Sequence, residues 1–243
     1  WSPSSEHMAL REMVRHFAES EIAPQALEHD RAERFNLDLF RRLGELGLLG
    51  VTIDERFGGS GMDATAAVIV HEKISSHVPG FCLAYLAHSI LFANNVAQNG
   101  NDAQKQNYLP KACDGSLVGG MCLSEPGVGT DLLGMQTLAK RQDDHYVLTG
   151  AKMWITNGAV NDQDLGDAFL VYANTGGERG KNLSLFLVDK QTPGLSLGQK
   201  IKDKLGMRAS TTAELVFDNC RVPVQNLVGH EGQALTHMMR NLQ

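Results

Sequence analysis

Apolar residues recur at helical spacing through the first half of the chain. The first expected helix carries them at intervals of three and four, at Leu10, Met13, Val14 and Phe17. Pro24 is expected to end this helix, because proline has no backbone N–H to donate. Asn36, Asp63 and Asp102 each lie where a later apolar stripe begins, and their side chains are suited to cap the helices that follow.

The region from residue 78 to residue 116 is also expected to be helical. Val78-Pro79-Gly80 breaks the pattern, so the next helix is predicted over residues 83–96. The helix capped by Asp102 is expected to end near Pro110. These elements predict an all-helical N-terminal domain over residues 1–116.

After Gly115 the spacing becomes that of β-strands. Apolar and β-branched runs of strand length lie at residues 135–141, 145–148, 151–155, 168–173, 183–189 and 213–217. No helix-length segment separates them, so an antiparallel barrel or sandwich is predicted for residues 117–227. Residues 228–243 begin another helix, with Glu231 expected near its start. The predicted fold class is therefore α+β, with a C-terminal helical domain that has only begun.

The composition excludes several kinds of function. Of 243 residues, 21% are charged and 42% hydrophobic, as in an ordinary folded protein, and the net charge of −6 argues against nucleic-acid binding. No apolar run approaches the ~18–20 residues that span a bilayer, so no membrane partner is expected. No C-x-x-C pair occurs, and nothing completes a ligand set around His77 and His88, so no metal is expected.

Two motifs carry the candidate chemistry. GGMCLSEPGVGTD, at residues 119–131, is typical of a strand end followed by a loop whose small residues can approach a flat or phosphorylated ligand. LTGAKMWITNG, at residues 148–158, places Trp154 and Thr156 at the end of another strand, before the turn pair Asn157-Gly158. An aromatic face and a hydroxyl two residues later can flank a planar heterocycle. Either motif alone is also common as a plain turn.

Together the two motifs resemble the paired flavin-binding signature of the acyl-CoA dehydrogenases. The resemblance covers nearly the whole chain, through ERFGGSGMD, GNDAQKQNYLP, DKLGMRASTTAELVFDNCRVPVQNLVG and HEGQALTHMM. LAHSI and LVGHEG are most similar to the isovaleryl-CoA-specific members. The resemblance implies a helical domain, a middle β-domain and a C-terminal helical domain. The chain stops at Gln243, where this last domain is expected to continue.

The resemblance also implies an FAD cofactor and the residues that hold it. These residues are Met121, Leu123, Ser124, Gly129, Thr130, Trp154, Ile155 and Thr156. Among them, Trp154 is expected to pack on the flavin ring and Thr156 to hydrogen-bond near flavin N5. The acyl-CoA substrate is expected to contact Thr130, Gly180 and Lys181, although Lys181 also suits a solvated loop cation.

The implied reaction is the α,β-dehydrogenation of a short or branched acyl-CoA thioester such as isovaleryl-CoA. A glutamate removes the α-proton while the β-hydrogen leaves as hydride to the flavin, and the electrons pass to electron-transfer flavoprotein. Glu125 lies within the flavin loop and is interpreted as structural. The catalytic base is therefore expected beyond Gln243, and the chain ending there is expected to be inactive and to retain FAD poorly.

Other interpretations stay open. The same fold serves acyl-CoA oxidases and flavin monooxygenases, and a short chain without a base is also compatible with an inactive fragment or binding module. The full-length dehydrogenase would be a homotetramer in leucine catabolism or fatty acid β-oxidation. It would lie in the mitochondrial matrix of a eukaryote or in the cytoplasm of a bacterium.

Overall fold

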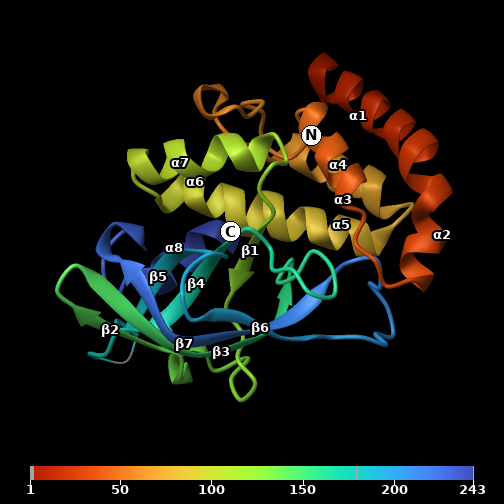
Figure 1. The fold of residues 1–243 in the computed structure, drawn as a ribbon. Helices are drawn as coiled ribbons and strands as arrows, with labels where there is room; N and C mark the ends of the chain where they lie inside the picture. The colour runs from red at the N-terminus through yellow and green to blue at the C-terminus, as the bar shows by residue number, and fades with distance from the viewer. Residues whose placement is uncertain (1–2, 179, 243) are drawn as a thin grey trace.

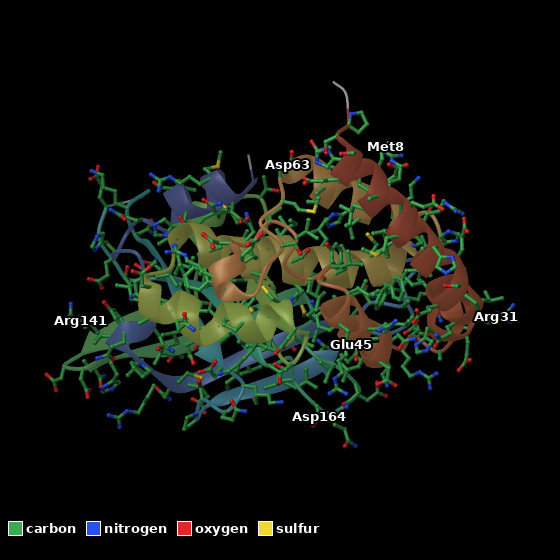
Figure 2. The ribbon with its side chains drawn as sticks, turned by 90° about the horizontal axis from the view of Figure 1, so that it is seen from above. Met8, Arg31, Glu45, Asp63, Arg141 and Asp164 are labelled. Carbon is green, nitrogen blue, oxygen red and sulfur yellow. The ribbon has the colours of Figure 1, made fainter. Side chains whose placement is uncertain are left out.

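A layer of helices lies on a β-sheet formed by the second half of the chain (Figure 1). The computed structural model describes residues 3–178 and 180–242. Seen from above, Arg31 at the end of the second helix and Arg141 on the second strand lie at opposite ends of the molecule (Figure 2). The helical elements are α1 (Ser5–Phe17), η1 (Ala18–Ile22), α2 (Ala23–Arg31), α3 (Leu37–Glu45), η2 (Glu55–Phe57), α4 (Ala64–Ser75), α5 (Pro79–Leu86), η3 (Ala87–Asn94), α6 (Asn95–Asn99), α7 (Asp102–Cys113), η4 (Leu132–Gly134), η5 (Val224–Asn226) and α8 (Ala234–Leu242).

The first helix does not stop at Pro24, so that prediction was wrong. The π-helical turn η1 joins α1 to α2 without a break, and Pro24 occupies the first turn of α2. Proline is tolerated there because the first N–H groups of a helix have no partner within it. The apolar face predicted for α1 is confirmed, with Leu10, Val14 and Phe17 buried.

Two of the three predicted helix caps are confirmed. The Asn36 side chain accepts a hydrogen bond from the backbone N–H of Leu39 at 3.1 Å, at the start of α3. The Asp63 side chain accepts one from the N–H of Ala66 at 3.0 Å, at the start of α4. Each bond satisfies a donor that the helix itself leaves unpaired.

Asn101 caps α7 in place of the predicted Asp102. The Asn101 side chain accepts from the N–H of Gln104, and the Gln104 side chain accepts from the N–H of Asn101. This reciprocal pair makes Asp102 the first residue of the helix, where its charge suits the helix dipole. The helix also continues through Pro110 to Cys113, one turn beyond its expected end.

Helices α5, η3 and α6 form one continuous helix from Pro79 to Asn99. By length and composition this helix is able to cross a membrane, so the expectation that no segment reaches that length was wrong. The predicted helix over residues 83–96 was too short because the π-helical turn and the flanking turns were not foreseen. However, 67% of its most apolar window is buried within the fold, as in the core helix of a folded domain.

The sheet confirms the α+β prediction. Within the described residues it has eight strands, in the order β6-β7-β3-β2-β4-β5-β8, with β1 beside β4. Pairing is antiparallel except between β1 and β4 and at a single pair between β2 and β4. The strands are β1 (Gly119–Cys122), β2 (Leu138–Gln142), β3 (His145–Thr156), β4 (Ala168–Asn174), β5 (Leu183–Asp189), β6 (Leu195–Lys200), β7 (Thr212–Pro223) and β8 (Leu227–Val228).

Strands β4 and β5 are buried on both faces, which explains their nearly continuous apolar sequences. On β4, Leu170 and Tyr172 belong to the core shared with the helical residues Phe92 and Leu109. The alternate residues Phe169 and Val171 belong to a second core within the β-domain. Its other large members are Tyr146, Phe186 and Phe217. The helical half has a further core of its own around Phe40 and Tyr85.

The last helix begins later than predicted. α8 starts at Ala234, so Glu231 lies in the preceding turn and does not open the helix. The helix packs on β5 and α6, and the side-chain amide of Asn94 donates to the Asn241 side chain at 3.1 Å. Met238 is buried and Met239 is half exposed.

His88 joins the helical layer to the sheet from a fully buried position. Its Nδ1 accepts a hydrogen bond from the N–H of Gly119 at 3.0 Å, and its Nε2 lies 2.9 Å from the carbonyl oxygen of Ala112. This geometry requires the neutral ring with its proton on Nε2. Burial lowers the pKa of His88 to about 4. In the part of the chain that the structure describes, no group of three or more His, Cys, Asp or Glu residues could hold a metal ion.

We expect His88 to make the fold sensitive to acid. Because its folded pKa lies below its ordinary value of 6.5, the unfolded chain binds more protons between pH 6.5 and about 4. The free energy of unfolding should therefore fall by up to roughly 3 kcal/mol as pH drops through that window. Urea unfolding at several pH values measures it, with a non-titrating His88→Gln variant as control. An equal slope in both proteins would contradict this assignment.

Candidate functional site

An open hollow of about 170 Å³ is lined by residues from both sequence motifs. Its walls are Ala87, Leu91, Met121, Leu123, Ser124, Trp154, Ile155 and Thr156. Six of these residues are among the eight predicted to bind the cofactor. The hollow therefore brings together the end of β1, the loop after it, the end of β3 and one helix, η3.

Trp154 stands on a β-bulge near the end of β3. The pairing with β7 passes from Lys152 opposite Leu215 to Ile155 opposite Ala213, so two residues of β3 face one residue of β7. Trp154 lies within this bulge and adopts a left-handed backbone conformation, with φ of 60°. That conformation costs a bulky residue roughly 1–2 kcal/mol. The side chain is 56% exposed, so an aromatic surface is available at the hollow.

The two walls of the hollow are joined by a backbone hydrogen bond. The N–H of Met153 donates to the carbonyl oxygen of Ser124 at 2.9 Å, across from β3 to the loop. Among the described residues, neither the Ser124 hydroxyl nor the Thr156 hydroxyl has a hydrogen-bond partner. Both side chains line the hollow, so both hydroxyls are available to the edge of a polar ligand.

Asn157 links the two strands that line the hollow to α5, the helix that continues into η3. It is fully buried with φ of 63°, and its side-chain amide donates to the carbonyl oxygens of Ala84, at 2.9 Å, and Gly119, at 3.1 Å. These bonds join the end of β3 to α5 and to β1. The sequence identified Asn157 as a turn residue after the strand but not as this tertiary link, because spacing alone does not show what a side chain reaches.

Glu125 is buried and fully engaged. Its Oε1 accepts from the Thr137 N–H at 2.9 Å and from Lys152 Nζ at 2.9 Å, and its Oε2 accepts from the Gln136 N–H at 2.7 Å. Burial alone raises the pKa of Glu125, but the charge of Lys152 and these hydrogen bonds hold it below the ordinary value. The Glu125 carboxylate thus holds the loop after β1 to the segment before β2 and to β3, in agreement with the interpretation of Glu125 as a structural residue.

The other predicted site residues lie outside the hollow. Gly129 and Thr130 are exposed in the loop that follows the 125–128 turn, and an added Cβ at Gly129 would meet nothing within 4 Å. Gly180 has φ of 91°. The Lys181 side chain is 77% exposed and lies 3.3 Å from Glu178. The structure therefore brings neither pair to the hollow.

Two lining residues were missed by the sequence analysis. Ala87 and Leu91 come from η3, one helical turn apart, within a helix that had been predicted. This helix is apolar on all sides, so its pattern gave no sign of which face meets the hollow. The eight lining residues include no acid, base or thiol.

Comparison with known proteins identifies the family. Residues 4–116 match the family model described as acyl-CoA dehydrogenase, N-terminal domain, and residues 120–220 match the model described as acyl-CoA dehydrogenase, middle domain. The chain belongs to the acyl-CoA dehydrogenase family. The two matches divide the chain where the structure passes from the helical layer to the sheet.

The relatives that this chain resembles are longer than the chain itself. It is 41% identical over 244 residues to the mitochondrial isovaleryl-CoA dehydrogenase of Pongo abelii, covering 98% of this chain and 56% of that protein. It is 38% identical over 238 residues to the short-chain-specific acyl-CoA dehydrogenase of Clostridium acetobutylicum, covering 98% of this chain and 61% of that protein. The chain thus spans little more than half the length of these relatives.

Solved structures share the whole described fold. A chain from the structure described as the electron transferring flavoprotein of Acidaminococcus fermentans superposes with a TM-score of 0.94 at 33% identity, covering 100% of this chain and 62% of that one. An acyl-CoA dehydrogenase of Bacillus anthracis complexed with FAD superposes with a TM-score of 0.89 at 33% identity, covering 99% of this chain and 41% of that one.

We expect Asn157→Ala to destabilise the fold by roughly 2–3 kcal/mol. The variant loses two hydrogen bonds made by a fully buried side chain. Asn161→Ala is the control, since the exposed Asn161 side chain bonds within its own turn, to the N–H groups of Gln163 and Asp164 and to the Asp164 carboxylate. The control should lower the free energy of unfolding by about 1 kcal/mol or less. Equal effects in chemical denaturation would show that Asn157 is not a tertiary link.

Proposed function

We propose that this chain binds the flavin ring of FAD in the hollow and that the whole protein oxidises a short or branched acyl-CoA thioester. The observation that carries the proposal is the meeting of both motifs at one hollow, beside an exposed and strained Trp154. A strained aromatic residue is retained where function uses its geometry. The family and the FAD complex of a related structure support the same cofactor.

The lining residues fit a planar heterocycle. Trp154 offers an aromatic face, and Met121, Leu123 and Ile155 offer apolar contact. The unpartnered hydroxyls of Ser124 and Thr156 would hydrogen-bond to polar atoms at the edge of the ring. When bound, FAD supplies the redox chemistry, in which it accepts a hydride from the substrate.

The exposed loop residues are proposed for the rest of the ligands. Gly129 and Thr130 would approach the pyrophosphate of the cofactor, since the loop backbone there is unobstructed. Thr130, Gly180 and Lys181 would contact the acyl-CoA. The catalytic base is proposed to lie beyond Gln243, because none of the lining residues can take a proton from the substrate and Glu125 is engaged inside the loop.

The relatives support a proposal for the substrate class and the partners. Isovaleryl-CoA dehydrogenases and a short-chain-specific acyl-CoA dehydrogenase are among the similar proteins, so we propose a short or branched acyl chain. Electron-transfer flavoprotein is proposed as the electron acceptor, in agreement with the subject of one similar structure. A homotetramer is proposed for the full-length protein. It would reside in mitochondria if eukaryotic, as the names of several relatives state for them, and otherwise in the cytoplasm.

Anaerobic titration of the full-length protein with isovaleryl-CoA and butyryl-CoA tests the activity. We expect the visible absorbance of the bound flavin to bleach with one of these substrates. Electron-transfer flavoprotein should then restore the oxidised spectrum far faster than air does. Rapid, stoichiometric formation of hydrogen peroxide in air would show instead that the protein is an oxidase.

Variants of Trp154 and Thr156 test the site itself. Thr156→Ala should leave the fold intact and weaken FAD binding by ~0.5–1.5 kcal/mol through one lost hydrogen bond. Trp154→Ala should weaken binding further through the loss of stacking area. Trp154→Gly should change the free energy of unfolding by less than about 1 kcal/mol, because relief of the left-handed strain offsets lost contacts. Unchanged FAD affinity and flavin spectrum in both alanine variants would refute the assignment.

A further inference from the structure

Behind the hollow lies an ion pair that no step of the proposed reaction uses. Lys152 Nζ and Glu125 Oε1 are 2.9 Å apart, and their side chains are 0% and 4% exposed. A buried ion pair contributes little net free energy to a fold, because the cost of removing two charges from water offsets much of their attraction. Such a pair is well suited to fix a particular geometry, since each charge demands several hydrogen bonds in set directions.

The pair ties three separate segments together. Besides Glu125, the Lys152 ammonium donates to the carbonyl oxygen of Leu123 at 3.1 Å. Glu125 in turn accepts from the backbone N–H groups of Gln136 and Thr137. The loop after β1 and the segment before β2 are therefore both held to β3 at the single position 152.

The same position is where the bulge begins. Lys152 makes the last regular pair with Leu215 before the register shift that places Trp154 in its left-handed conformation. On the opposite wall, Leu123 accepts from the ammonium group, and Ser124 accepts from the next β3 residue, Met153. A β3 residue two positions before Trp154 thus bonds directly to the Leu123 wall.

We propose that Lys152 and Glu125 are positioning residues that fix the spacing between the Leu123–Ser124 wall and the Trp154 wall, and through it the affinity and orientation of the flavin. This inference rests on the proposed function. Neither side chain lines the hollow, so the pair acts through the residues that it holds. Burial lowers the pKa of Lys152, and the charge of Glu125 opposes that shift.

The experiment compares variants of this pair with one variant of a second ion pair, which joins the residue before β4 to the residue after β5. Lys152→Met, Glu125→Gln and the double variant are prepared in the full-length protein. Lys190→Met is the control, because Lys190 pairs with Asp167 at 2.7 Å and neither residue lines the hollow. For each protein the dissociation constant of FAD, the visible circular dichroism of bound flavin and the urea stability of the apoprotein are measured.

We expect each single variant at the buried pair to weaken FAD binding at least tenfold and to change the visible circular dichroism. The double variant should recover apoprotein stability, because no unpaired charge remains buried, yet it should still bind FAD weakly with an altered spectrum. The Lys190→Met control should bind FAD as the wild type does. If a single variant fails to fold, FAD binding can still be measured in the double variant.

Two results would overturn the inference in different ways. A folded double variant that binds FAD within twofold of the wild type, with the same visible spectrum, would show that the pair only stabilises the fold. The proposed function would then stand. A wild-type protein that binds no FAD would refute the proposed function, and the positioning role would fall with it.

Discussion

The register shift between β3 and β7 is the constraint on which the site depends. A regular strand points consecutive side chains to opposite faces, so it could not bring both Trp154 and Ile155 to the same hollow. The bulge makes this possible at a cost in backbone strain. The surrounding contacts compensate that cost: the Met153 N–H bonds to the opposite loop, and Asn157 fixes the strand end three residues later.

The helical layer and the sheet act as one support for this bulge. Asn157 and His88 both bond to Gly119, one through its carbonyl oxygen and the other through its N–H. The first residue of β1 is therefore held from two sides, by the sheet and by the long helix. Because the hollow takes its walls from β1, β3 and that helix, the same buried polar contacts that join the two layers also define its shape. Asn157 and His88 thus contribute both to the stability of the fold and to the shape of the hollow.

Much of this arrangement could be predicted from the sequence, and the failures have physical causes. The end of β3 was found because alternation and the Asn157-Gly158 pair are local signals, and the same holds for the caps Asn36 and Asp63. Asn101 and Asp102 are both good caps, and only the reciprocal bond with Gln104 decides between them. The π-helical turns and the bulge were not predicted, since they depend on packing between segments distant in sequence. For that reason the positions of Ala87 and Leu91 at the hollow were also missed.

The intrinsic fluorescence of Trp154 tests most directly whether the hollow is the flavin site. In the full-length protein, the contribution of Trp154 is the difference in emission between the wild type and a Trp154→Phe variant. If the flavin ring packs on this side chain, titration with FAD should quench its emission in step with occupancy and saturate at one FAD per chain. Saturable FAD binding that leaves the Trp154 emission unchanged would contradict the account.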